Sequence, residues 1–246
     1  MAASPDPSAD GSRRFVLVHG AFHAAWSWEP VAEELRARGH RVDVFDLPGA
    51  GDDPTPVSEV TLDLAAKRVV EVIEGSPEPV VLVGHSMGGI VVTEVAGRVP
   101  ERISRLVYVT AFRPVDGESL LDLAGLPEGA ADGVQANIVI EGEPPVAVFD
   151  RSKAREVFYH DLSEEAMAAA TARLDPQPLS IFATPVTLPE PIAIPTDYVV
   201  CTEDGAIPPE LQTLMAERSQ ATVFRLASSH SPMFSFTREL SDILAR

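Results

Sequence analysis

Residues 80–89 read Val-Val-Leu-Val-Gly-His-Ser-Met-Gly-Gly, and this stretch decides the fold. Its first four residues are apolar and mostly β-branched, which predicts a buried strand. Residues 90–99 have the pattern of a helix, which Pro100 ends. The Gly-x-Ser-x-Gly motif therefore lies on a sharp strand-to-helix turn, where its two glycines remove side chains that would clash. Such a turn lifts the Ser86 hydroxyl above the sheet edge, toward the positive end of the following helix.

Length and charge limit what the rest of the chain can be. The 246 residues, 45% of them hydrophobic, can bury one sizeable core. The formal net charge of −18 repels phosphate backbones and anionic membranes, which argues against nucleic acid or a membrane as a partner. No apolar run approaches the length of a membrane span. Residues 1–12 lack the apolar centre of a signal peptide and are expected to form a flexible leader. The single cysteine, Cys201, excludes an internal disulfide, and with these features indicates a cytoplasmic protein.

Strand and helix patterns alternate along most of the chain. Alternation of this kind predicts βαβ units and a mostly parallel sheet flanked by helices. The predicted strands are 14–18, 41–45, 80–83, 105–110, 198–201 and 222–226, and the predicted helices are 26–38, 61–74, 90–99, 208–218 and a last one from about 234.

The alternation breaks over residues 113–195. This stretch is rich in loops and proline, with one clear helix from Ser163 to Arg173. An insertion in a parallel sheet is expected to cover the carboxyl ends of the strands, where such sheets bind ligands. We therefore predict a core of residues 13–112 and 196–246 and a cap of residues 113–195.

A serine hydroxyl needs a base to become a nucleophile. In proteins with this type of serine turn, the order along the chain is Ser, Asp or Glu, then His. Of the six histidines only His230 falls in a loop after the last predicted strand, so we predict that it is the base for Ser86.

The acid that orients the base should follow the penultimate strand. Asp204 lies at the end of that strand, just before a glycine turn, and Glu203 beside it is its rival. Asp197 starts the strand and so lies at the wrong end. Residues 110–113 after the preceding strand contain no carboxylate, which favours Asp204.

Charge that develops on a carbonyl oxygen needs hydrogen-bond donors already in place. We expect one donor to be the backbone N–H of Met87, directly after the nucleophile. The other should come from the turn after the first strand, at Ala21, with Phe22 next in line. Gly20 permits the close backbone approach that this requires. Apolar side chains are expected to form the substrate pocket, namely Phe22, Phe112, Phe182 and Met233, with Phe149, Phe158 and Tyr159 as further candidates from the cap.

Three motifs together resemble one branch of the α/β-hydrolases. They are His-Gly-Ala-Phe-His-Ala-Ala-Trp-Ser-Trp at 19–28, Gly-His-Ser-Met-Gly-Gly at 84–89, and Cys-Thr-Glu-Asp at 201–204 with Ile-Pro at 207–208. The branch contains the hydroxynitrile lyases and the plant methylesterases that act on salicylate and jasmonate esters. The resemblance implies an α/β-hydrolase fold with a cap insertion after the sixth strand, and no metal or organic cofactor. It further implies a triad of Ser86, Asp204 and His230 with an oxyanion hole at Ala21 and Met87.

The sequence departs from the lyases at two positions. They have a threonine beside the first-turn histidine and a lysine directly after the catalytic histidine, where this chain has Gly20 and Ser231. Without the lysine, nothing obvious stabilises a leaving cyanide, which disfavours cyanohydrin cleavage.

The leading hypothesis is therefore a serine esterase acting on small to medium apolar esters, as a monomer or homodimer. The alternative is a tailoring enzyme of secondary metabolism on the same scaffold, catalysing a cyclisation, dehydration, lactone opening or lyase step. A non-catalytic ligand-binding module is the third hypothesis, and it predicts a degraded triad.

Overall fold

A computed structural model describes residues 11–246, so residues 1–10 of the expected leader lie outside the described residues. Its centre is a six-stranded sheet in the order β2-β1-β3-β4-β8-β9, with every neighbouring pair parallel. This confirms the predicted mostly parallel α/β fold. The strands are β1 (Arg14–Val18), β2 (Arg41–Val44), β3 (Val80–Ser86), β4 (Ile103–Ala111), β8 (Thr196–Cys201) and β9 (Thr222–Leu226).

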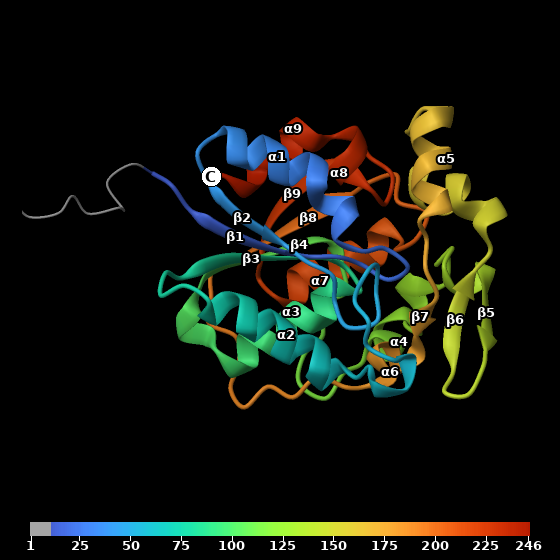
Figure 1. Ribbon diagram of the computed structural model, residues 1–246, viewed down its shortest axis with the longest axis horizontal. Helices are drawn as coiled ribbons and strands as arrows, with labels where there is room; N and C mark the ends of the chain where they lie inside the picture. Colours follow the sequence, from blue (N-terminus) through green and yellow to red (C-terminus); the bar gives the residue numbers. More distant parts are fainter. Residues whose placement is uncertain (1–10) are drawn as a thin grey trace, which may run out of the picture.

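Helices cover both faces of this sheet (Figure 1). One face carries α1 (Glu29–Ala37), α8 (Pro232–Ser235) and α9 (Thr237–Leu244), and the other carries α2 (Leu62–Glu74), α3 (Gly88–Arg98) and α7 (Pro209–Arg218). Along β1, Phe15 and Leu17 pack on the first face while Val16 and Val18 pack on the second. Strands β1 and β3 at the centre of the sheet are buried along almost their whole length, which explains their nearly continuous apolar runs.

The insertion of residues 113–195 lies between β4 and β8 in the chain. It contains α4 (Leu120–Ala124), β5 (Ile138–Glu141), β6 (Val146–Phe149), α5 (Glu164–Ala172), β7 (Gln177–Pro178) and α6 (Leu179–Ala183). Figure 1 shows α5, β5 and β6 at the end of the sheet opposite the start of β1, where the parallel strands finish. Ser163 caps α5 as predicted, accepting a hydrogen bond from Ala166 N.

One expectation about this insertion was wrong. It follows the fourth strand of the sheet in chain order rather than the sixth, because only four strands precede it within residues 11–246. The insertion also contains a feature that the sequence did not predict, since β5, β6 and β7 form a second, antiparallel sheet. These strands are short, and Val139 and Ile140 of β5 are exposed, so they lack the buried apolar run that marks the strands of the main sheet.

Among residues 11–246, every helix is too short or too polar to span a lipid bilayer.

Candidate active site

Ser86 is the last residue of β3 and has a left-handed backbone, with φ of 53°. The turn is possible because both motif glycines lack a Cβ. A Cβ on Gly84 would lie 2.8 Å from Gly88 O, and a Cβ on Gly88 would lie 2.7 Å from the carbonyl oxygens of Val18 and His19. Strain of this kind persists only where the surrounding structure enforces it. The sequence prediction of a sharp turn at Ser86 therefore matches the backbone.

His230 and Asp204 are brought together from the loops after β9 and β8. His230 Nδ1 lies 2.8 Å from Asp204 Oδ2, and their side chains are 1% and 0% exposed. A carboxylate oxygen accepts, so Nδ1 carries a hydrogen, and in the neutral form of the ring Nε2 has the lone pair. Glu203, by contrast, is exposed and contacts the neighbouring loops through its backbone.

Every lone-pair direction of the Asp204 carboxylate is used. Oδ1 accepts from the backbone N–H groups of Ala206, at 2.6 Å, and Ile207, at 3.0 Å. Oδ2 accepts from His230, from Thr110 Oγ1 and from Gln212 Nε2 at 3.2 Å. Full hydrogen bonding is what allows a charged carboxylate to be buried.

The loop of His230 is also attached to the strand of Ser86. His85 Nε2 donates to the His230 carbonyl at 2.8 Å, and the two rings pack with centroids 4.6 Å apart. Burial lowers the pKa of His85 well below its usual value, so this imidazole is neutral. Within residues 11–246, Ser86 Oγ makes no hydrogen bond, either to His230 or to another group.

The turn after β1 lies so close to Ser86 that a Cβ added to Gly20 would be only 2.7 Å from Ser86 Cβ. His19 Nδ1 donates to the Gly20 carbonyl at 2.9 Å, since His19 Nε2 accepts from Leu47 N at 3.0 Å. Burial lowers the pKa of His19 and keeps it neutral.

Neither the Ala21 N–H nor the Met87 N–H is a donor in the turns and loops of residues 11–246. Two buried N–H groups without partners are unusual and mark a place where a ligand oxygen can bind.

A cavity of about 40 Å³ lies at Ser86. It is lined mainly by apolar side chains from the core and the insertion, and three of the four predicted pocket residues are among them. The lining includes Ala21, Phe22, Met87, Phe112, Phe158 and Phe182.

The fourth predicted pocket residue, Met233, does not line the cavity. It is fully buried on α8 in the hydrophobic cluster on the other face of the sheet, together with Trp28 and Leu240. The chain turns away from the cavity directly after His230, because Pro232 begins α8. Although Met233 is close in sequence to His230, it is therefore not part of the lining.

Sequence reasoning missed several residues that support the site. Thr110 and Gln212 hold Asp204, and Asp132 lines the cavity. Tyr159, a pocket candidate from the sequence, instead hydrogen-bonds to His23. Burial raises the pKa of Asp132, whose Oδ1 accepts from the backbone N–H groups that follow it. For these residues the one available signal in the sequence was Gln212, which lies inside a predicted helix. A glutamine side chain that is buried there must find hydrogen-bond partners.

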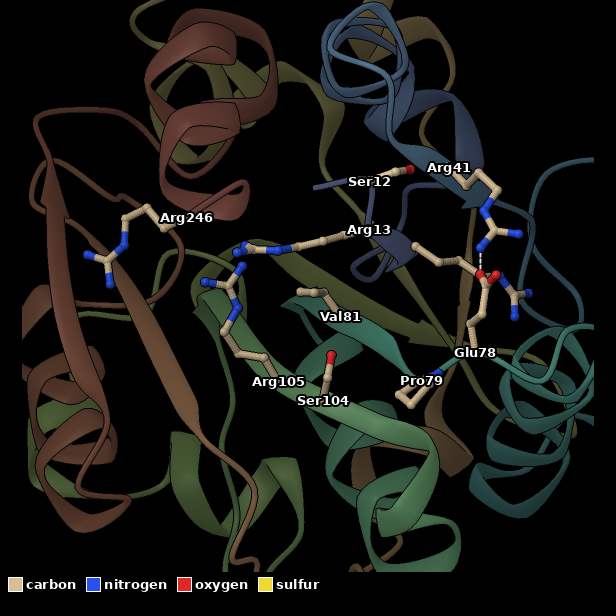
Figure 2. Close-up of a pocket in the computed structure, with 10 residues that line it drawn as sticks. Ser12, Arg13, Arg41, Glu78, Pro79, Val81, Ser104, Arg105 and Arg246 are labelled. Carbon is tan, nitrogen blue, oxygen red and sulfur yellow. Dashed lines mark ion pairs between the residues drawn. The ribbon is translucent and has the colours of Figure 1, made fainter. Parts of the chain in front are cut away.

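A larger cavity of about 730 Å³ lies at the opposite end of the sheet, where β1, β2, β3 and β4 begin (Figure 2). It is lined by Arg13, Arg14, Arg41, Arg105 and Arg246, among others. Three of these arginines already have acidic partners. Arg14 pairs with Asp43, Arg41 with Glu78 and Arg105 with Asp197. This cavity is far from Ser86 and much of its positive charge is compensated, so it is not part of the candidate active site.

In the part of the chain that the structure describes, no three His, Cys, Asp or Glu side chains are grouped to hold a metal ion.

Residues 15–243 match the Alpha/beta hydrolase family. A putative chloroplastic methylesterase 13 of Arabidopsis thaliana is 32% identical over 95% of this chain, which spans only 55% of that protein. Methyl jasmonate esterase 1 of Vitis vinifera is 30% identical, with 91% of this chain and 92% of that protein covered. The crystal structure of a pyrethroid hydrolase from Sphingobium faniae has a TM-score of 0.87 at 26% identity, covering 95% of this chain and 96% of that one.

Proposed function

This chain belongs to the alpha/beta hydrolase family, and we propose that it is a serine esterase that cleaves small to medium apolar esters. The observation that carries the proposal is the 2.8 Å hydrogen bond between His230 Nδ1 and Asp204 Oδ2, beside the turn that presents Ser86. Relatives named as methylesterases and as a methyl jasmonate esterase support an ester as substrate.

In the proposed reaction, Ser86 Oγ attacks the ester carbonyl carbon while its proton passes to His230 Nε2. The carbonyl oxygen becomes an oxyanion and accepts hydrogen bonds from the Ala21 and Met87 N–H groups. Collapse of this intermediate breaks the bond to the alcohol, which leaves with the proton from His230. Water then attacks the acyl-Ser86 ester, His230 takes its proton, and the carboxylic acid is released as Ser86 regains a proton.

The hydrogen bond missing between Ser86 and His230 is compatible with this role, because such contacts often tighten only when substrate binds. The Asp204 carboxylate keeps the His230 ring in one tautomer and stabilises its charged form. Thr110 and Gln212 are proposed to keep that carboxylate in position.

The pocket supports an uncharged ester with an apolar body. Its volume of about 40 Å³ is little more than one water molecule occupies, whereas pockets for drug-sized ligands are roughly 300–1,000 Å³. A bound ester therefore requires the lining side chains or the insertion to move aside. We propose residues 113–195 as the cap that moves, over a core of residues 13–112 and 196–246.

Cytoplasmic residence and a monomeric or homodimeric state belong to the same proposal. The lone, buried Cys201 fits a reducing compartment. No metal or organic cofactor has a place in the proposed reaction.

The test replaces Ser86 with alanine and measures hydrolysis of p-nitrophenyl acetate and of a panel of methyl, aryl and lactone esters. S86A should lose turnover and labelling by a fluorophosphonate probe, while its circular dichroism spectrum and urea midpoint stay close to those of the wild type. S241A is the control, because Ser241 is a buried serine that lies on α9, outside the candidate site. Full activity of S86A would refute the assignment of the nucleophile.

A further inference from the structure

A hydrogen-bonded chain joins the insertion to the turn after β1. Tyr159 Oη lies 2.7 Å from His23 Nε2, and His23 Nδ1 lies 2.8 Å from the Ala21 carbonyl oxygen. Tyr159 and His23 are 0% and 1% exposed. Because the carbonyl can only accept, Nδ1 carries the hydrogen of the imidazole. Nε2 therefore accepts, and the tyrosine hydroxyl donates.

The protonation states agree with these directions. Burial lowers the pKa of His23 to about 3, so the ring is neutral near pH 7 and keeps its lone pair on Nε2. Burial also raises the pKa of Tyr159 above its usual value, so the phenol keeps its proton.

This series of hydrogen bonds from Tyr159 through His23 ends at Ala21, whose N–H is the proposed oxyanion donor. The Ala21 N–H shares a rigid peptide plane with the Gly20 carbonyl, which His19 Nδ1 holds. The next plane contains the Ala21 carbonyl, which His23 holds. Two imidazoles thus fix both peptide planes that meet at Ala21. The following residue, Phe22, has φ of 63°, a backbone that persists only when its surroundings enforce it.

Only one of the two imidazoles depends on the insertion. The second nitrogen of His19 is held by the Leu47 N–H of the core, whereas that of His23 is held by Tyr159. The residues that follow Tyr159 are themselves anchored to the two other loops of the site. His160 Nε2 donates to the Glu203 carbonyl at 2.7 Å, and Asp161 Oδ2 accepts from Ser229 N at 2.9 Å.

We infer that Tyr159 is a positioning residue that acts through His23 to orient the Ala21 N–H toward the developing oxyanion. The insertion then helps to set the rate of the chemical step as well as covering the pocket. This inference rests on the proposed esterase function, and it concerns a residue that touches neither substrate nor the reacting atoms.

The test replaces Tyr159 with phenylalanine, which keeps the ring and removes the donor. For an apolar aryl ester, Y159F should lower kcat about tenfold, a fraction of the roughly 100-fold to 1,000-fold loss on removing an oxyanion donor, with KM changed less than twofold. The affinity for an aryl trifluoromethyl ketone, whose adduct with Ser86 carries an oxyanion, should fall by a similar factor. Y108F is the matched control, because Tyr108 is also fully buried and its hydroxyl pairs with Thr93 Oγ1 at 2.8 Å.

H23Q interrupts the same chain from the core side and serves as a second variant. If Tyr159 acts through His23, the Y159F/H23Q double variant should be no slower than the slower single variant. Urea unfolding of each variant confirms that it is folded at the assay temperature.

The outcomes separate this inference from the proposed function. Wild-type protein that hydrolyses esters, with Y159F matching Y108F in kcat and in ketone affinity, overturns the inference alone. A rise in KM at constant kcat also overturns it, since Tyr159 would then shape the pocket only. Wild-type protein with no ester turnover and no fluorophosphonate label on Ser86 overturns both.

Discussion

His85 Nε2 donates a hydrogen bond of 2.8 Å to the backbone carbonyl of His230, which links the residue beside the proposed nucleophile, Ser86, to a loop 145 positions away. Because a carbonyl accepts, the other imidazole nitrogen carries no hydrogen, and His85 Nδ1 is a buried atom without a partner in residues 11–246. His85 therefore has a structural role, because it links the turn of Ser86 to the loop of His230.

Replacing His85 with phenylalanine keeps an aromatic ring and removes the hydrogen bond to the His230 carbonyl. We expect kcat to fall roughly tenfold to 100-fold, because small misplacements of a base have effects of that size. Steady-state kinetics with p-nitrophenyl acetate measures the change. H40F is the control, since His40 lies in the turn between α1 and β2. A kcat within twofold of the wild type would show that the loop of His230 is held by other contacts.

Gly20 should tolerate no side chain. An added Cβ would lie 2.7 Å from Ser86 Cβ and 2.9 Å from His85 Nδ1, distances at which something must shift. G20A is expected to lose about 1–3 kcal/mol of unfolding free energy through overpacking and to slow fluorophosphonate labelling of Ser86 at least tenfold. In the control G75A the nearest contact is 3.3 Å, to the Val72 carbonyl. Equal labelling rates in both variants would contradict this prediction.

Thr110 donates to the carboxylate of Asp204 from the end of β4. T110V keeps the β-branched shape and removes the donor, so Asp204 loses one of the bonds that offset its burial. We expect the unfolding free energy to fall by about 1–3 kcal/mol and kcat to fall roughly tenfold. T93V removes a buried hydroxyl from α3 and should lower stability without that loss of kcat. Urea titrations and initial rates provide both numbers.

Acid should destabilise the fold through its buried histidines. The pKa values of His19, His23 and His85 are all lowered by burial, that of His23 to about 3, whereas each titrates near 6.5 when unfolded. Below pH 6.5 the unfolded state therefore binds more protons. Stability is complete above pH 6.5 and decreases as the pH falls toward 3, by up to about 1.4 kcal/mol per pH unit for each histidine.

H23Q isolates one of these contributions. Its unfolding free energy, measured in urea between pH 7.0 and 5.0, should depend on pH less steeply than that of the wild type. Parallel curves for the two proteins would show that His23 does not titrate during unfolding in this range.

The order of elements could be predicted because its signals are local. Strand β9 lies at the predicted residues 222–226, and α2 begins directly after Thr61, whose hydroxyl caps it. The second sheet could not be predicted in this way. Strand β6 pairs with β7 across the insertion, and in the local β5–β6 hairpin Val139 and Ile140 remain exposed, so no buried apolar run identified these strands.

The sequence alone determined that the chain bends sharply at Ser86, because two positions without a Cβ lie between a buried strand and a helix. Through chain order it also limited the proposed base to His230. Tertiary structure decided which groups meet. Asp204 rather than Glu203 faces His230, Met233 turns away from the cavity, and Tyr159 reaches His23 across 136 positions. Local preference acts over a few residues, whereas these pairings depend on how distant segments pack against one another.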